Sequence, residues 1–174
     1  MGVSIIYGII VFVATTIGAI AGLDSGVIIK PTFDMIELHN ANTISLYSSC
    51  AVFFMAFISI LKFYRQKIKI KRNIIFPISF GSILGGISIF LGIGGGQLNI
   101  ALLTIFFSYE IKEAAIYSVA TIFFSQCSKL IGVFYKNEFL NFDLSPLPII
   151  CIFAIVGGHL GAKLNMKFTN KKSI

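Results

Sequence analysis

The chain has 174 residues, of which 56% are hydrophobic and 12% are charged, with a net charge of +7 and a mean hydropathy of +0.91. Soluble domains average about 25% charged residues, so this composition excludes a soluble globular domain and indicates an integral membrane protein. The basic residues cluster between apolar segments, so the positive net charge indicates an orientation in a bilayer and not a nucleic-acid partner.

Seven apolar segments follow one another along the chain: residues 3–21, 27–38, 43–63, 74–91, 97–108, 113–135 and 147–164. No Lys or Arg precedes Lys30, unlike a secretory signal peptide, so the first segment is interpreted as a retained membrane segment. The second and fifth segments are short. At 1.5 Å per residue, residues 27–38 reach about 18 Å, against a hydrocarbon core of about 30 Å.

Glycine-rich breaks precede both short segments, at residues 22–26 and 92–96. Glycine costs about 1 kcal/mol relative to alanine inside a helix, so such clusters end a helix. Irregular backbone at membrane depth is tolerated only where protein buries it or where it lines a polar cavity. Broken helices of this kind form substrate sites in many transporters, although a tight turn at the membrane surface stays an open alternative.

Basic residues concentrate in two places, the loop around residues 62–72 and the C-terminal tail. Both are expected on the cytoplasmic side. An even number of crossings must then lie between them, which favours a crossing by residues 97–108 over a re-entrant segment.

A shift of 70 residues aligns the two breaks and brings Tyr47-Ser48 onto Tyr117-Ser118 and Phe53-Phe54 onto Phe123-Phe124. Each half then offers a break, a short helix and a long helix. The sequence therefore predicts an all-α, polytopic integral membrane protein with two internal repeats, residues 1–73 and 74–174, in one transmembrane domain.

The second break, followed by Lys112-Glu113-Ala114-Ala115 and a serine-rich helix, resembles the sulfite exporter TauE/SafE family, and Gly22, Gly26 and Pro31 extend the resemblance into the first half. The resemblance implies duplicated multi-pass proteins of the cell membrane that move small anions, often sulfur-containing. Asp24 stands where the family usually has glycine, and Gln97 where proline is common. The resemblance also implies that family members are usually longer than this chain.

Polar residues on segment 113–135 give the candidate anion path. One helical face of this segment carries the hydroxyl groups of Ser118, Thr121, Ser125 and Ser128. This face either solvates an anion in place of water or forms hydrogen bonds to neighbouring helices. Lys129 is costly at membrane depth and should face a cavity or partner, unless it reaches the membrane surface beside Tyr135.

Lys30 is the counterpart of Lys129 beside the first break, where Asp34 could neutralise it. Asn99 either donates to an anion or caps its short helix. The candidate substrate-binding residues are Gly22, Gly26, Pro31, Gly92, Gly94, Gly95, Gly96, Asn99, Ser118, Thr121, Ser125, Gln126 and Lys129.

Nothing in the sequence indicates catalysis, a cofactor or a metal site, since nucleophile–base pairs, metal-ligand spacing and a nucleotide-binding loop are all missing. The leading hypothesis is a secondary transporter of a small, sulfur-containing or similar anion. The alternative is a truncated, non-transporting homologue that acts as an assembly partner. The sequence leaves open whether the chain assembles as a homo-oligomer.

Overall fold

The computed structural model describes residues 2–36, 38–65, 79, 100, 104–105, 111–135 and 142–170. Its helices are α1 (Gly2–Ala21), α2 (Gly26–Asp34), α3 (Ala41–Arg65), α6 (Ile111–Tyr135) and α7 (Leu147–Asn170). The predicted all-α architecture is confirmed for this part of the chain. Most of the predicted segments 74–91 and 97–108 lies outside the described residues.

Four of these helices are long and apolar enough to cross a membrane: Ser4–Ala21, Ala41–Phe63, Ala114–Tyr135 and Leu147–Asn165. They correspond to four of the predicted segments. The largest difference is at α7, which continues to Asn170 beyond the predicted end at Leu164. The reason is that the last turns contain Asn and Lys, so the apolar signal stops before the helix does.

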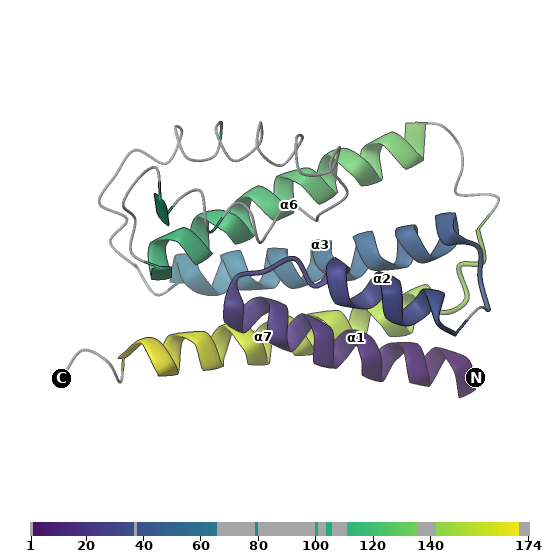
Figure 1. The fold of residues 1–174 in the computed structure, drawn as a ribbon, viewed down its shortest axis with the longest axis horizontal. Coiled ribbons are helices and arrows are strands. Elements are labelled where there is room, and N and C mark those ends of the chain that lie inside the picture. The colour runs from purple at the N-terminus through teal and green to yellow at the C-terminus, as the bar shows by residue number, and fades with distance from the viewer. Residues whose placement is uncertain are drawn as a thin grey trace.

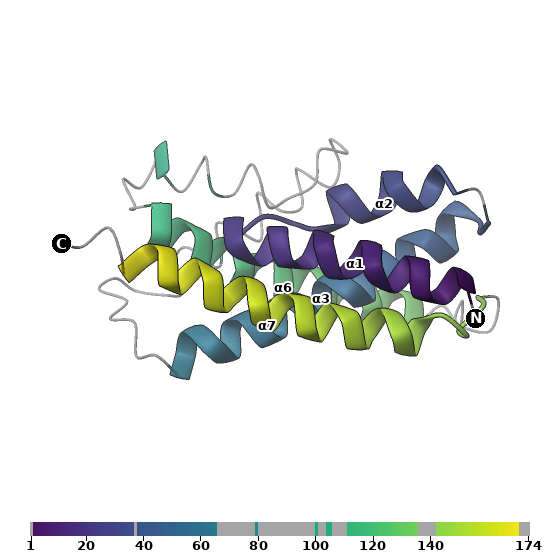
Figure 2. The same ribbon diagram turned by 90° about the horizontal axis from the view of Figure 1, so that it is seen from below.

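The helices form a bundle around α3, which contacts α1, α2, α6 and α7 (Figures 1 and 2). α1, α3 and α7 run in one direction, whereas α2 and α6 run in the other. α1 and α2 therefore form a hairpin in which the nine-residue α2 returns only part of the way along α1. A short second helix that follows a break agrees with the sequence prediction.

Small residues let α7 lie close against α1. A Cβ at Gly161 would come within 2.5 Å of the Thr16 carbonyl oxygen, and one at Gly157 within 2.2 Å of the Thr15 hydroxyl. Gly157 and Gly161 are four residues apart and so lie on one face of α7. This is the small-xxx-small pattern by which membrane helices approach closely, and it fixes the α1–α7 pair on one side of the bundle.

The basic ends of α3 and α7 lie at the same end of the bundle (Figure 1). The Lys62 ammonium on α3 donates a hydrogen bond of 2.8 Å to the carbonyl oxygen of His159 on α7. α6 also begins at this end. The arrangement agrees with an even number of crossings between Arg65 and Ile111, although the crossings themselves fall outside the described residues.

α3 and α6 are related by the same shift that aligns the two halves of the sequence. Both helices have 25 residues, and each bound of α6 lies 70 positions after the corresponding bound of α3. The equivalent residues Phe53 and Phe123 stack on each other with ring centroids 5.1 Å apart. Two helices of the same length thus meet in opposite directions at their midpoints. The internal repeat as a whole stays a prediction, because the second break is outside the described residues.

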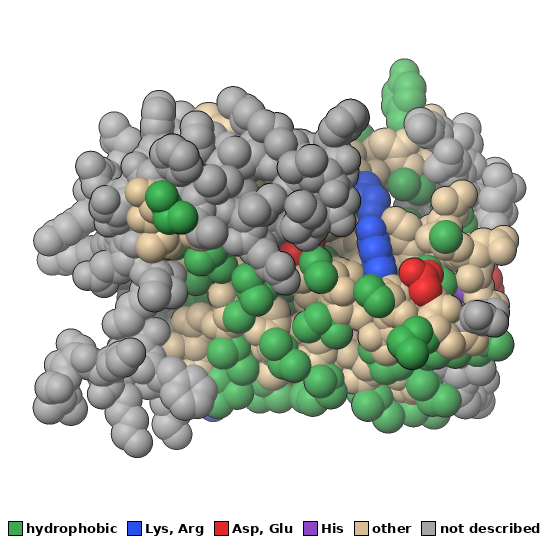
Figure 3. Space-filling model, viewed as in Figure 1, with side chains coloured by type: hydrophobic (Ala, Val, Ile, Leu, Met, Phe, Trp, Pro, Cys, Tyr) green, Lys and Arg blue, Asp and Glu red, His purple; other side chains and the backbone are tan. Residues whose placement is uncertain are grey.

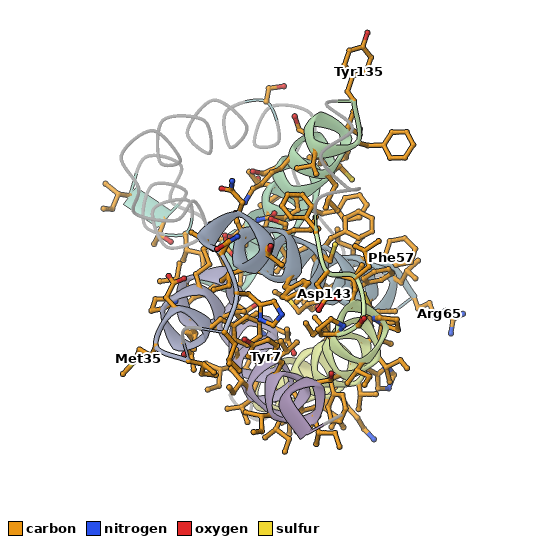
Figure 4. All side chains as sticks on the ribbon, turned by 90° about the vertical axis from the view of Figure 1, so that its right-hand side faces the viewer. Tyr7, Met35, Phe57, Arg65, Tyr135 and Asp143 are labelled. Carbon is orange, nitrogen blue, oxygen red and sulfur yellow. The ribbon has the colours of Figure 1, made fainter. Side chains whose placement is uncertain are left out.

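A polar cluster closes the opposite end of the bundle. The Tyr7 hydroxyl lies 3.0 Å from His39 Nδ1, and His39 Nε2 lies 3.7 Å from the Asp143 carboxylate. The Tyr47 hydroxyl donates to the Asp143 carbonyl oxygen. In Figure 4, Tyr7 and Asp143 lie near the middle of this end, whereas Tyr135 points outward. The cluster ties α1 and α3 to the loop before α7.

Hydrogen bonds from the Ser145 backbone N–H and side chain, with a smaller contribution from the neighbouring His39, hold the pKa of the Asp143 carboxyl below its ordinary value. A carboxyl whose pKa is lowered by folding stabilises the fold above its unfolded pKa, about 4, and loses that contribution as the pH falls further. We therefore expect Asp143→Ala to lower the unfolding temperature at neutral pH.

The gap in unfolding temperature between Asp143→Ala and the unchanged protein should disappear below about pH 4. Thermal unfolding of the purified protein at several pH values measures it. Asp34→Ala, which removes an exposed carboxylate from α2, is the matched control and should show no such gap. A gap of constant size at low pH would contradict the role of the charge.

Candidate functional site

The first break is a compact turn between α1 and α2. Gly22 has φ +70°, a left-handed conformation that glycine adopts without steric cost. A Cβ at Gly22 would also come within 2.7 Å of the Ala115 Cβ on α6. The Leu23 N–H donates to the Gly18 carbonyl at 2.9 Å. The glycine predicted from the sequence is therefore needed both for the turn and for the approach of α6.

The Asp24 carboxylate, just before α2, accepts a 2.8 Å hydrogen bond from the Gly26 N–H. Gly26 lies against α3, since a Cβ there would come within 3.0 Å of the Ser48 hydroxyl oxygen. Ser25 between them is buried, and its hydroxyl has no hydrogen-bond partner in the described part of the chain. The break is thus a polar region enclosed by α1, α3 and α6.

Two lysines meet beside this break. The Lys129 ammonium on α6 donates a 2.9 Å hydrogen bond to the Ser45 hydroxyl on α3. Lys30 on α2 is close enough for its positive charge to act on Lys129, and both charges act on the Asp24 carboxylate. We call Asp24, Lys30, Ser45 and Lys129 the lysine cluster. Figure 3 shows Lys and Arg side chains in a continuous strip, with acidic side chains on both sides of it.

The contacts of the lysine cluster distinguish between the alternatives that the sequence left open for Lys30 and Lys129. The hydrogen bond to Ser45 directs the Lys129 side chain across to α3, and not along α6 toward Tyr135. The structure shows no ion pair between Lys30 and Asp34, both of which it describes, and the charge of Lys30 acts on Asp24 and Lys129 instead. The cluster contains two cations and one carboxylate, so it has an excess of positive charge.

The predicted polar face of α6 divides along its length. Ser118 and Thr121 are buried, Ser125 is half-buried and Ser128 is exposed. The Thr121 hydroxyl donates to the Tyr117 carbonyl at 3.0 Å, which satisfies it within its own helix. The structure therefore does not show this face as a single continuous path.

The remaining candidates are dispersed or undescribed. The Gln126 side-chain oxygen is buried and has no hydrogen-bond partner within the described residues. Pro31 lies inside α2 with an exposed side chain. The second break and its neighbour fall outside the described residues: Gly92, Gly94, Gly95, Gly96 and Asn99.

Sequence reasoning missed Ser45 and gave Asp24 no role in binding. Ser45 belongs to a hydroxyl-rich first half of α3 with Thr43, Ser48 and Ser49. Since Ser48 aligns with Ser118 at the shift of 70, the serine-rich face of α6 has a counterpart on α3. That correspondence is the signal that could have pointed to α3.

Comparison with known families gives a match over a range that contains α6. A sequence model of the family described as sulfite exporter TauE/SafE matches residues 69–173, which is more than half of the chain. The chain belongs to the TauE/SafE family. No curated protein and no solved structure matches it.

TauE/SafE proteins are membrane transporters, which agrees with the four apolar helices. The matched range contains Lys129, whereas the other three members of the lysine cluster precede it. The cluster therefore joins the part of the chain that carries the family match to the break in the first half.

Proposed function

We propose that this TauE/SafE protein is a secondary transporter of a small anion and that the anion binds at the lysine cluster. The single observation that carries the proposal is the 2.9 Å hydrogen bond that holds the Lys129 ammonium of α6 against Ser45 of α3, where the charge of Lys30 on α2 also acts on it. Charged side chains within a membrane bundle are costly and commonly mark substrate paths. Broken helices supply the irregular, polar backbone that such sites use.

The excess positive charge of the lysine cluster favours an anionic substrate over a cation or a neutral solute. Ammonium groups form strong, charge-assisted hydrogen bonds with oxyanions, and the family description makes sulfur oxyanions the first class to test. We also propose that the two halves are inverted repeats. Support comes from the shared offset, the opposite directions and the Phe53–Phe123 stack of α3 and α6.

The test is transport by the purified chain in lipid vesicles. Radiolabelled sulfite, sulfate or thiosulfate should accumulate or exchange across vesicles that contain the protein, and protein-free vesicles should show neither. Choline and an uncharged solute of similar size serve as competitors that should not inhibit. Failure of every anion to bind or cross would favour the alternative role, that of a non-transporting assembly partner.

We place the protein in the cell membrane, with the basic ends of α3 and α7 in the cytoplasm. In a background without its own three cysteines, Tyr135→Cys should react with a membrane-impermeant thiol reagent in intact cells. Tyr135 is 90% exposed at the opposite end of the bundle. Arg65→Cys should react only after permeabilisation.

Equal labelling of Tyr135→Cys and Arg65→Cys in intact cells would contradict the orientation, because the two residues end antiparallel helices at opposite ends of the bundle. Labelling of Arg65→Cys alone would show that the bundle has the opposite orientation in the membrane. Both variants must first reach the membrane at the level of the unchanged protein.

A further inference from the structure

Lys62 joins α3 to α7 at the basic end of the bundle. Its ammonium donates a hydrogen bond of 2.8 Å to the His159 carbonyl oxygen and lies 3.4 Å from His159 Nε2. Since an ammonium can only donate, Nε2 accepts and the imidazole carries its proton on Nδ1. An ammonium has three N–H donors, so within the described residues one donor of Lys62 and the Nδ1–H of His159 remain for a further acceptor.

Two further cations lie beside this contact. Arg65 follows Lys62 by three residues on α3, and Lys163 follows His159 by four on α7, spacings at which side chains are neighbours on a helix surface. Both side chains are exposed. α1, α3 and α7 contain no Asp or Glu, and none of the three cations forms an ion pair in the described part of the chain. Their positive charges thus lack a carboxylate partner there.

An exposed apolar row on α3 leads to one of these cations. Phe57 and Leu61 are 40% and 45% exposed, and Arg65 continues them at intervals of four residues, so all three share one face of the helix. In Figure 4, Phe57 and Arg65 both point outward on the same side of the bundle. This face is thus apolar within the candidate membrane span and cationic at its end.

A second row on α7 has the same character. Ile152 and Val156 are 60% and 45% exposed. They precede His159 and Lys163 at intervals of four, three and four residues, so the four side chains share one face of α7. Because His159 belongs to this row and contacts Lys62, the row lies along the side of α7 next to α3. The two rows thus flank the place where the helices meet.

We propose that an anionic phospholipid binds along these two rows, with its phosphate held by Lys62, Arg65 and Lys163 and its acyl chains against the apolar residues. The inference goes beyond the proposed function and does not depend on it. Ammonium and guanidinium groups form charge-assisted hydrogen bonds with phosphate oxygens, and basic sites between membrane helices on the cytoplasmic side bind anionic head groups. A free phosphate ion has no apolar part to place on the rows, so the surface fits an amphiphile better than an inorganic anion.

A bound lipid differs from the general preference of cations for the cytoplasmic side. That preference depends only on the number of Lys and Arg residues. A lipid that contacts α3 and α7 at once binds only the folded bundle and therefore stabilises it. An anionic head group should stabilise more than a zwitterionic one, because the choline cation of a zwitterionic lipid neutralises the phosphate that the basic side chains would bind.

The test measures the unfolding temperature of the purified full chain in an uncharged detergent at constant ionic strength. Phosphatidylglycerol should raise it by about 5–10 °C at a concentration about 100-fold above its dissociation constant. Phosphatidylcholine with the same acyl chains, and glycerol phosphate without acyl chains, should change it little. Native mass spectrometry should show phosphatidylglycerol retained on the protein in preference to phosphatidylcholine.

Arg65→Gln combined with Lys163→Gln removes two exposed charges and leaves the Lys62 contact between the helices in place. Without lipid, this double variant should unfold at the temperature of the unchanged protein, but it should lose most of the shift with phosphatidylglycerol. The charge-conserving combination of Arg65→Lys with Lys163→Arg should keep the shift. Lys129→Gln is the matched control, since it removes a cation from α6 and should show the full shift.

Equal shifts with phosphatidylglycerol and phosphatidylcholine, or a full phosphatidylglycerol shift in the neutralised double variant, would overturn the inference. An equal shift with glycerol phosphate would also overturn it, because the surface would then bind a free anion. Sulfate binding and transport do not enter these measurements. Their failure would therefore overturn the proposed function and leave the lipid site standing.

Discussion

Gly161→Ala should prevent or severely weaken the packing of α7 on α1. The added Cβ would lie 2.5 Å from the Thr16 carbonyl oxygen and 2.7 Å from the Ala19 Cβ, and neither backbone nor Cβ atoms can rotate away. Overpacking of this kind costs about 1–3 kcal/mol or more. We expect a large fall in the unfolding temperature in detergent, or loss of the protein from the membrane fraction.

Gly132→Ala on α6 is the matched control, because a Cβ there would meet nothing within 4 Å. Alanine is the better helix former by about 0.5–1 kcal/mol, so this variant should be as stable as the unchanged protein or slightly more so. If Gly161→Ala were equally stable, the close approach of α1 and α7 would be wrong.

Lys129→Gln should weaken anion binding by about 10-fold to 100-fold, because it removes a hydrogen bond from a charged donor, worth about 1.5–3 kcal/mol. The variant should still fold, since removing a charge at membrane depth relieves a cost of insertion. Lys129→Arg keeps the charge but changes its shape, so it should recover part of the affinity. Ligand-induced thermal shifts with sulfate measure all three proteins.

Lys163→Gln is the control for Lys129→Gln, since it removes an exposed lysine from α7 and should leave sulfate affinity unchanged. Equal sulfate affinities of the unchanged protein, Lys129→Gln and Lys129→Arg would exclude Lys129 from the site. Binding would then have to rely on backbone N–H and hydroxyl donors near the break.

Much of the fold could be predicted because long apolar helices have a strong signal of their own. The start of α7 at Leu147 and the end of α6 at Tyr135 agree with the sequence prediction. The end of α2 was harder, since it stops at Asp34 and not at Leu38. Pro31 and the polar residues of this short helix leave no clear apolar period to mark where it stops.

The candidate site was less predictable, because its geometry depends on helix packing. Lys129 was identified from its cost in a membrane segment, and Lys30 from its position beside a break. Ser45 lies 84 residues from Lys129 in the sequence, and no local pattern reports which helix faces another. The same limit applies to His39, which lacks ligand-like spacing but meets Asp143 at the end of the bundle.

The stack of Phe53 on Phe123 has a consequence for the energy difference between two conformations of the bundle. A small tilt of α6 about this midpoint separates the helices at one end and brings them together at the other, while the stacked rings stay in contact. Since the two helices have the same length and run in opposite directions, opposite tilts exchange similar backbone contacts. The two conformations should then differ little in free energy, so a modest difference in anion affinity is enough to shift their populations.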